Sequence, residues 1–221
     1  MTEVDILCEE LMVNAIRERY PDDAILSEER GGSVSEDGRT WLLDPVDGTA
    51  NFMKANPMFC ACVSIVEDGS VTHAAVAAPR IGDLYHARAG GGAYRETGGR
   101  ETPMRVSDTQ KLEYAVVGAD LSLRSDKSQD SGVQKVLSGA WQLRALGSAG
   151  IRGAWLAAGY LDVSVGTRNT VWDYAPTVLL VTEAGGRATG LSGEPWSLSS
   201  DGLIATNGAL HDEVLGTIHR A

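Results

Sequence analysis

The stretch WLLDPVDGTANF, residues 41–52, carries the strongest structural signal in the sequence. Its first four residues are a short apolar run that predicts a buried strand ending at Asp44. Asp47 follows three residues later, with Pro45 fixing the backbone between the two carboxylates and Gly48 permitting a sharp turn. Residues 48–50 then open a helix, whose free N–H groups form an anion site.

Two carboxylates on one short turn raise each other's pKa unless a cation neutralises them. The natural occupant is a hard divalent cation with oxygen ligands, and Mg²⁺ is the commonest. The same residues also have a purely structural explanation, because a D-x-x-D-G turn is common and an Asp N-cap accounts for it. Two interpretations of residues 41–52 therefore remain, a cation site and a capped turn without a bound ion.

Acidic residues elsewhere in the chain favour the cation site. Glu28 and Glu29 follow the short strand AILS at 24–27, where a carboxylate at a strand end can point into the same crevice. Asp173 opens the otherwise apolar helix in VWDYAPTVLLVTEAGG, residues 171–186. A first-turn Asp also stabilises a helix by itself. Asp173 lies close to bulky Trp172 and to a core helix, however, so its carboxylate needs a partner.

Hydrophobic periodicity predicts strands and helices along the whole chain. We expect helices at 5–19, 134–137, 148–158, 172–184 and 210–218. We expect strands at 24–27, 41–44, 59–66, 71–78, 83–87, 113–119, 142–146, 161–165 and 203–205, with a hairpin turn at 67–69. This order predicts a layered α/β or α+β fold in a single domain, 1–221. Residues 1–120 would form a sheet half that binds metal and phosphate, and 121–221 a substrate-side half.

Composition excludes several classes of protein. The chain has 221 residues, 43% hydrophobic and 22% charged, which is ordinary for a globular protein. Its formal charge of −11 argues against binding a nucleic-acid polymer. No apolar run approaches about 18 residues, and the acidic N-terminus lacks the features of a secretory signal, so we expect a cytoplasmic protein with no membrane partner. Cys8, Cys60 and Cys62 have no zinc spacing and are expected to be reduced thiols.

Two motifs make the sequence resemble the inositol monophosphatase superfamily of Mg²⁺-dependent, Li⁺-sensitive phosphatases. The family pattern D-P-(I/V)-D-G-T-x-N-F stands here as residues 44–52, and its W-D helix ending in E-A-G-G stands as residues 172–186. Its G-E-E element appears as residues 27–29, with Ser27 in place of Gly. The G-S-x-G element matches residues 147–150. The resemblance implies an α-β-α-β-α sandwich and a phosphatase activity.

The resemblance also implies which residues would bind metal. Glu28, Asp44 and the backbone carbonyl of Val46 would hold one Mg²⁺ ion. Asp44, Asp47 and Asp173 would hold a second. The family pattern allows for a third ion and for Mn²⁺ as a substitute. A homodimer is the expected oligomeric state.

By the same resemblance, the catalytic residues would be Glu28, Thr49 and Asp47, with Glu28 and Thr49 orienting the attacking water. The amides of Gly48 and Thr49 would bind phosphate oxygens. The pocket for the alcohol part of the substrate would be lined by Gly147, Ser148 and Ala149.

Two departures from the family pattern affect the expected substrate. The chain begins close to Asp5, so the first family helix and a lysine-bearing loop are expected to be lacking, which would open the site. Gly166 stands where inositol-specific members carry an acidic residue seven positions before the W-D aspartate, which argues against inositol 1-phosphate. The nearby Arg168 and Asn169 would read a larger or more anionic alcohol, or form a surface loop without a role.

The sequence therefore predicts an Mg²⁺-dependent phosphomonoesterase that acts on a small phosphorylated metabolite. The alcohol would be a polyol, a sugar, an amino-alcohol or a nucleoside. A 3′-nucleotide or sugar bisphosphatase is an alternative within the same enzyme class. A non-catalytic binding or scaffold protein on the same fold is the alternative from another class.

Overall fold

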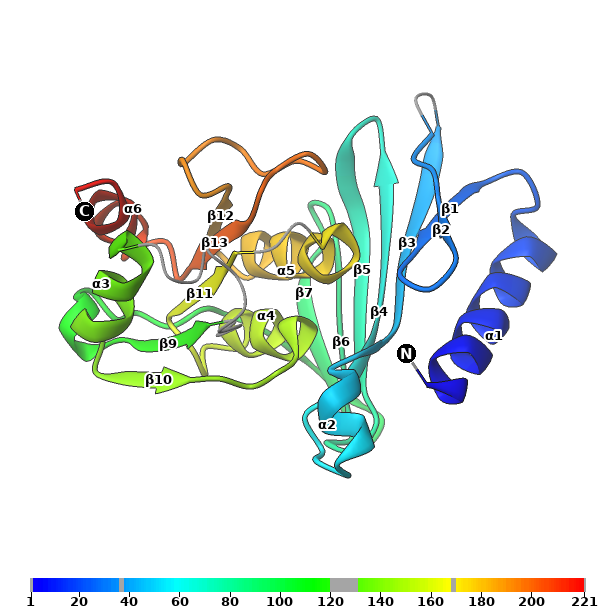
Figure 1. Ribbon diagram of the computed structural model, residues 1–221, viewed down its shortest axis with the longest axis horizontal. Helices are drawn as coiled ribbons and strands as arrows, with labels where there is room; N and C mark the ends of the chain where they lie inside the picture. Colours follow the sequence, from blue (N-terminus) through cyan, green and yellow to red (C-terminus); the bar gives the residue numbers. More distant parts are fainter. Residues whose placement is uncertain (1, 36–37, 120–130, 168–169, 221) are drawn as a thin grey trace.

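Two β-sheets alternate with three layers of helices in the computed structural model, which describes residues 2–35, 38–119, 131–167 and 170–220. Figure 1 shows α1 (Glu3–Arg19) outside the larger sheet, α4 (Ala149–Ala157) and α5 (Val171–Glu183) between the sheets, and α3 (Ser131–Gly139) and α6 (His211–His219) beyond the smaller sheet. The predicted α-β-α-β-α layering is confirmed.

The larger sheet has eight strands in the order β2-β1-β3-β4-β5-β6-β7-β8. β1 and β3 are parallel, and the other neighbouring strands are antiparallel. The bounds of the strands are β1 Ala24–Ser27, β2 Gly31–Gly32, β3 Arg39–Asp47, β4 Cys60–Glu67, β5 Ser70–Ala78, β6 Asp83–Arg88, β7 Gly92–Thr97 and β8 Arg100–Pro103.

The smaller sheet has five strands in the order β10-β9-β11-β13-β12. β10, β9 and β11 are parallel, whereas β13 runs antiparallel to both β11 and β12. The bounds are β9 Val116–Ala119, β10 Gln142–Arg144, β11 Val163–Gly166, β12 Arg187–Thr189 and β13 Leu203–Thr206. A short α2 (Thr49–Met53) follows β3, and a 3₁₀ turn, η1 (Leu112–Tyr114), precedes β9.

Period-two alternation decides which face of the larger sheet is buried. Leu42 is fully buried and packs in a cluster with Ala175 of α5, whereas its neighbour Trp41 points to the opposite face and meets Tyr20 beyond the end of α1. β4 alternates buried and half-buried residues along its whole length. The inner faces of both sheets therefore pack on α4 and α5, and they bury the main core.

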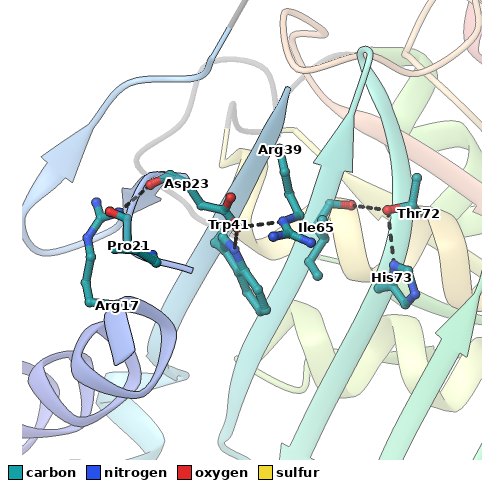
Figure 2. A network of polar contacts seen from close by, with 8 residues as sticks. All are labelled: Arg17, Pro21, Asp23, Arg39, Trp41, Ile65, Thr72 and His73. Carbon is teal, nitrogen blue, oxygen red and sulfur yellow. Dashed lines mark hydrogen bonds and ion pairs between the residues drawn. The ribbon is translucent and has the colours of Figure 1, made fainter. Parts of the chain in front are cut away.

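The C-terminal end of α1 is tied to the larger sheet by a polar network (Figure 2). Asp23 Oδ2 accepts hydrogen bonds from Arg39 Nε at 2.5 Å and from Trp41 Nε1 at 2.7 Å. Arg17 Nη1 donates to the carbonyl oxygens of Pro21 and Asp23. The Arg39 guanidinium lies 4.1 Å from the centre of the Tyr20 ring, a cation–π distance. These contacts fix α1 against β3.

Most predicted elements lie within two or three residues of their expected bounds, and the hairpin at 67–69 forms with positive φ at Asp68 and Gly69. One prediction is wrong. The strand expected at 41–44 extends to Asp47, so Pro45 and Val46 belong to the strand and not to a turn after it. Two smaller differences concern the expected strand at 113–119, which begins as η1, and the expected strand at 142–146, which ends at Arg144. Among the described residues, no helix is long and apolar enough to cross a membrane.

Candidate active site

An irregularity in β3 places Asp44 and Asp47 on one face of the larger sheet. Asp44 pairs with Cys62 of β4 and Asp47 pairs with Cys60, so three steps along β3 match two steps along β4. Residues three apart in a regular strand point to opposite faces. The extra residue in this β-bulge turns Asp47 back to the face of Asp44. Pro45, which has no N–H to donate, is compatible with this break in the ladder.

Asp47 is held by the N-terminus of α4. Its Oδ2 atom accepts hydrogen bonds from the Ser148 hydroxyl at 2.5 Å and from the Gly150 amide at 2.7 Å. Its Oδ1 atom accepts one from the Ala149 amide at 3.1 Å. Ser148 also accepts a bond from the Ile151 amide and is thereby the N-cap of α4. Asp47 thus links the larger sheet to the helix layer between the sheets, and its orientation is fixed.

The segment around Asp44 is organised by short local hydrogen bonds. Asp44 Oδ1 accepts from the Val46 amide at 2.9 Å, and the Thr49 hydroxyl donates to the Val46 carbonyl at 3.2 Å. Gly48 has φ of +92°, and a Cβ there would lie 3.0 Å from the Met58 carbonyl oxygen and 3.1 Å from that of Gly147. Only glycine fits this left-handed position between two backbone segments.

Asp173, in the first turn of α5, completes a group of three carboxylates. One oxygen from each of Asp44, Asp47 and Asp173 lies within 4.8 Å of the others. Asp173 Oδ1 is buried, and no described residue forms a hydrogen bond with it. Burial raises the pKa of Asp44, and the negative charges of Asp173 and Asp47 raise it further. Burial and the charge of Asp47 likewise raise the pKa of Asp173.

Glu28 follows β1 and lies at the exposed mouth of the same site. Its amide donates to the Leu43 carbonyl of the parallel strand β3, which places Glu28 beside Asp44. Burial raises the pKa of the Glu28 carboxyl, and the charges of Glu29 and Asp47 act in the same direction. Glu28 is therefore a neighbour of the three-carboxylate group and not one of its members.

The residues predicted for the site surround one cavity of about 330 Å³. Its walls contain every predicted metal, water and phosphate residue and the three predicted pocket residues: Glu28, Asp44, Val46, Asp47, Gly48, Thr49, Gly147, Ser148, Ala149 and Asp173. The predicted substrate residue Arg168 lies outside the described residues. A larger cavity of about 500 Å³ lies between α3, α6 and the 191–201 loop, apart from these residues. The candidate active site is therefore identified by its converging carboxylates and not by the volume of its cavity.

Gly166 lies on β11, and its surroundings explain why it lacks a side chain. A Cβ at Gly166 would lie 2.3 Å from Tyr174 Oη and 2.5 Å from Tyr174 Cζ. The Tyr174 ring of α5 therefore fills the space into which a longer side chain from β11 would project.

Two residues with a clear place in the site were missed in the sequence. Asn51 Nδ2 donates to the Met58 carbonyl at 2.6 Å and the Leu146 carbonyl at 2.8 Å, so it ties α2 to the loop before α4. Arg152 of α4 is 2% exposed and lines the cavity. The motif itself contains Asn51. For Arg152 the available signal was one cation within the otherwise small and apolar segment AGIRGAWLA.

The residues present fit a divalent cation. Three buried or half-buried carboxylates converge, and one buried carboxylate oxygen has no partner within the described ranges of the chain. Such an oxygen is costly unless a positive charge lies nearby. All the available donors are oxygens, the type that Mg²⁺ prefers. A second possible group shares Asp47 and adds the buried thiols of Cys60 and Cys62. Burial raises the pKa of the Cys60 thiol, which favours its protonated form.

Known proteins resemble this chain along its whole length. The model of the inositol monophosphatase family matches residues 1–221. A fructose-1,6-bisphosphatase/inositol-1-monophosphatase of Thermotoga maritima is 33% identical, over 99% of this chain and 82% of its own. A histidinol-phosphatase of Mycobacterium tuberculosis is 32% identical, over 97% and 83%. A Nus factor SuhB of Pseudomonas aeruginosa is 33% identical, over 99% and 82%.

The same relationship is visible in three dimensions. The solved structure of the Thermotoga maritima IMPase superposes with a TM-score of 0.89 and 32% sequence identity, covering 100% of this chain and 83% of the other. The fold and the sequence comparison therefore agree, while the named activities of the relatives differ from one another.

Proposed function

Because the chain belongs to the inositol monophosphatase family, we propose that it is a metal-dependent phosphomonoesterase whose reaction takes place at the Asp44–Asp47–Asp173 group. The observation that carries the proposal is the convergence of these three carboxylates, from β3 and α5, beside Thr49 and Glu28 in one cavity. Mg²⁺ is the expected ion, with Mn²⁺ as a substitute.

The metal ligands are assigned from the geometry and the family pattern together. Glu28, Asp44 and the Val46 carbonyl would hold one ion, and Asp44, Asp47 and Asp173 a second. When bound, the ions would lower the pKa of a water molecule and stabilise the charge on the leaving oxygen. Ser148 and the α4 amides fix the orientation of Asp47, and support of this kind keeps a ligand in place.

Thr49 and Glu28 are suited to orient the attacking water. The Thr49 hydroxyl donates a hydrogen bond to the Val46 carbonyl, so its oxygen lone pairs are left to accept a hydrogen bond from water. Burial raises the pKa of the Glu28 carboxyl, and a carboxylate with a raised pKa is a stronger base. Gly48 and Thr49 are proposed to bind phosphate oxygens through their amides, and Gly147, Ser148 and Ala149 to line the pocket for the alcohol.

The substrate is proposed as a small phosphorylated metabolite, with a 3′-nucleotide or sugar bisphosphate as the alternative within the same enzyme class. The non-catalytic alternative also has support, because one relative with 33% identity is named as a Nus factor. A cytoplasmic homodimer is proposed from the family resemblance, and sedimentation velocity would test the oligomeric state.

Phosphate release from a panel of phosphomonoesters, with Mg²⁺ and with EDTA, tests the proposal. The panel should contain inositol, histidinol, sugar and nucleoside phosphates. We expect turnover that requires Mg²⁺ and that falls at least about 100-fold in Asp44→Asn, since even indirect support of a ligand contributes about 10–100-fold. Metal binding by calorimetry, without turnover on any substrate, would instead favour the non-catalytic alternative.

A further inference from the structure

Arg152 is a buried cation in the wall of the proposed active site. It lies one turn into α4 and is 2% exposed. Its aliphatic part packs against β9, where a Cβ at Gly118 would lie 2.7 Å from Arg152 Cγ. Its Nε atom donates to the Ser164 hydroxyl of β11 at 2.9 Å. The side chain is therefore held between two strands with a fixed direction.

The charge of Arg152 has no carboxylate partner in the part of the chain that the structure describes. No Asp or Glu oxygen there lies within 4.0 Å of its guanidinium, and Ser164 is the side-chain acceptor it contacts. A guanidinium has five N–H donors, and the bond from Nε to Ser164 uses one of them. Removing an unpaired charge from water is costly, and a buried cation of this kind is expected to meet an anion.

Of the two strands that hold Arg152, β11 does not supply that anion. β11 ends in Ser164, Val165 and Gly166, none of which carries a charge. The place where a longer side chain from Gly166 would project is filled by the Tyr174 ring. The cavity that Arg152 lines does contain carboxylates, but Asp47 is bonded to Ser148 and the α4 amides, and the three-carboxylate group fits metal ions.

We propose that Arg152 is a specificity-determining residue that binds a second anionic group, a phosphate or a carboxylate, on the alcohol part of the substrate. This inference rests on the proposed phosphatase function and narrows its substrate class to phosphomonoesters with a second anion. A guanidinium suits this role because it is planar, always charged and able to donate two parallel hydrogen bonds to a phosphate or carboxylate.

Two matched pairs of substrates test the inference. In the first pair, 2-phosphoglycerate differs from glycerol 2-phosphate in having a carboxylate. In the second, fructose 1,6-bisphosphate differs from fructose 1-phosphate in having a second phosphate. We expect the wild-type protein with Mg²⁺ to show at least a tenfold higher kcat/KM for the more anionic member of at least one pair.

Arg152→Met should lower that preference at least tenfold, through a higher KM for the more anionic substrate and with a smaller change in kcat. Arg152→Lys, which keeps the charge and loses the planar fork, should retain part of the preference. The matched control is Arg144→Met, because Arg144 is exposed on β10 and should leave the preference as it is.

The outcomes separate the inference from the function on which it rests. Turnover of the wider phosphomonoester panel without turnover of any of these four substrates would overturn this inference alone. No turnover on the panel or on the four substrates would overturn the phosphatase proposal and this inference with it. Turnover without preference in the wild type, or an equal loss on both members of each pair in Arg152→Met, would overturn the inference alone. If Arg152→Met fails to fold, as circular dichroism would show, the wild-type preference and the Arg152→Lys variant still decide.

Discussion

Single side chains in this protein connect layers that are far apart in the sequence. Asp47 receives hydrogen bonds from Ser148 and from the first amides of α4, so one carboxylate serves both as a proposed metal ligand and as the anchor of a helix. His211 is fully buried and bonds through its two ring nitrogens to Thr189 and Thr206. The contacts of Asp47 and of His211 each lead to a testable prediction.

Replacing Ser148 with alanine should reduce both stability and catalysis. The change removes the N-cap of α4, which contributes about 1 kcal/mol, and the 2.5 Å hydrogen bond to Asp47. Loss of a group that orients a metal ligand reduces activity or metal affinity by about 10–100-fold. Thermal unfolding and an Mg²⁺ titration of activity measure both effects. Ser138→Ala, at an exposed position on α3, is the control, and a Ser148 variant with wild-type Mg²⁺ dependence would contradict the role given to Ser148.

His211 should make the protein less stable as the pH falls from neutral. Burial lowers the pKa of His211 from 6.5 to about 4, so its neutral form is favoured in the folded protein. The stabilisation is complete above pH 6.5 and is lost as the pH falls toward 4, by about 3 kcal/mol in all. Urea unfolding between pH 7.5 and 4.5 should show a weaker pH dependence in His211→Gln than in the wild type. The exposed His73→Gln should match the wild type, and equal slopes for all three proteins would refute the assignment.

At the scale of elements, the strands were predictable and the bulge was not. β4 and β5 follow period-two alternation, and Asp68-Gly69 is a strong turn signal, so the hairpin could be read directly from the sequence. In β3, by contrast, Pro45 suggested that the strand had ended. Proline is also tolerated at a bulge, and only the pairing of Asp44 and Asp47 with Cys62 and Cys60 distinguishes the two cases.

For the candidate site too, residues close together in the sequence could be predicted, whereas residues brought in by packing could not. The residues of the D-P-x-D-G-T motif could be assigned to the site because they are neighbours in the chain. Arg152 could not, because an arginine in a helix is usually solvent-exposed, and its burial depends on the packing of α4 against β9 and β11. Gly166 was noted as a departure, but its close approach to Tyr174 required the position of α5.

The attachment of α1 can be tested through Asp23. Its carboxylate accepts hydrogen bonds from Arg39 and Trp41, and the Arg39 hydrogen bond lowers its pKa (Figure 2). Asp23→Asn should lower the free energy of unfolding by about 1 kcal/mol, because the pair is partly exposed. Chemical denaturation at pH 7 measures the change. The neighbouring exposed Asp22→Asn is the control, and an effect of equal size there would show that general charge and not this network is responsible.

At the scale of the whole molecule, the proposed site destabilises the fold that carries it. Asp44 and Asp173 have raised pKa values because burial and the neighbouring carboxylates oppose their ionisation. In the absence of a cation, the protonated forms of Asp44 and Asp173 stabilise the folded protein. This contribution is complete below the unfolded pKa of about 4 and is lost as the pH rises through the raised pKa values of the folded protein. The chain's charge of −11 adds to this repulsion.

Removing one carboxylate should therefore stabilise the metal-free protein. In EDTA at pH 7.5, Asp44→Asn should melt at a higher temperature than the wild type, by several degrees for about 1–2 kcal/mol in a chain of this size. Mg²⁺ should raise the melting temperature of the wild type and have little effect on the variant. Glu113→Gln, at an exposed carboxylate far from the site, is the control. A lower melting temperature for Asp44→Asn in EDTA would show that Asp44 stabilises the fold without a cation.

The separation of Asp47 and Asp173 by more than half of the chain has a consequence for synthesis on the ribosome. The larger sheet and the D-P-x-D-G-T segment emerge first, and α5, which supplies the third carboxylate, emerges only after β11. A nascent chain thus carries an incomplete acidic group until late in translation, when α4 and α5 can dock between the sheets. The proposed metal ion would therefore bind late, to a nearly finished chain. A product that stops before α5 leaves the ribosome with α4 as the one described helix able to cover the inner face of the larger sheet.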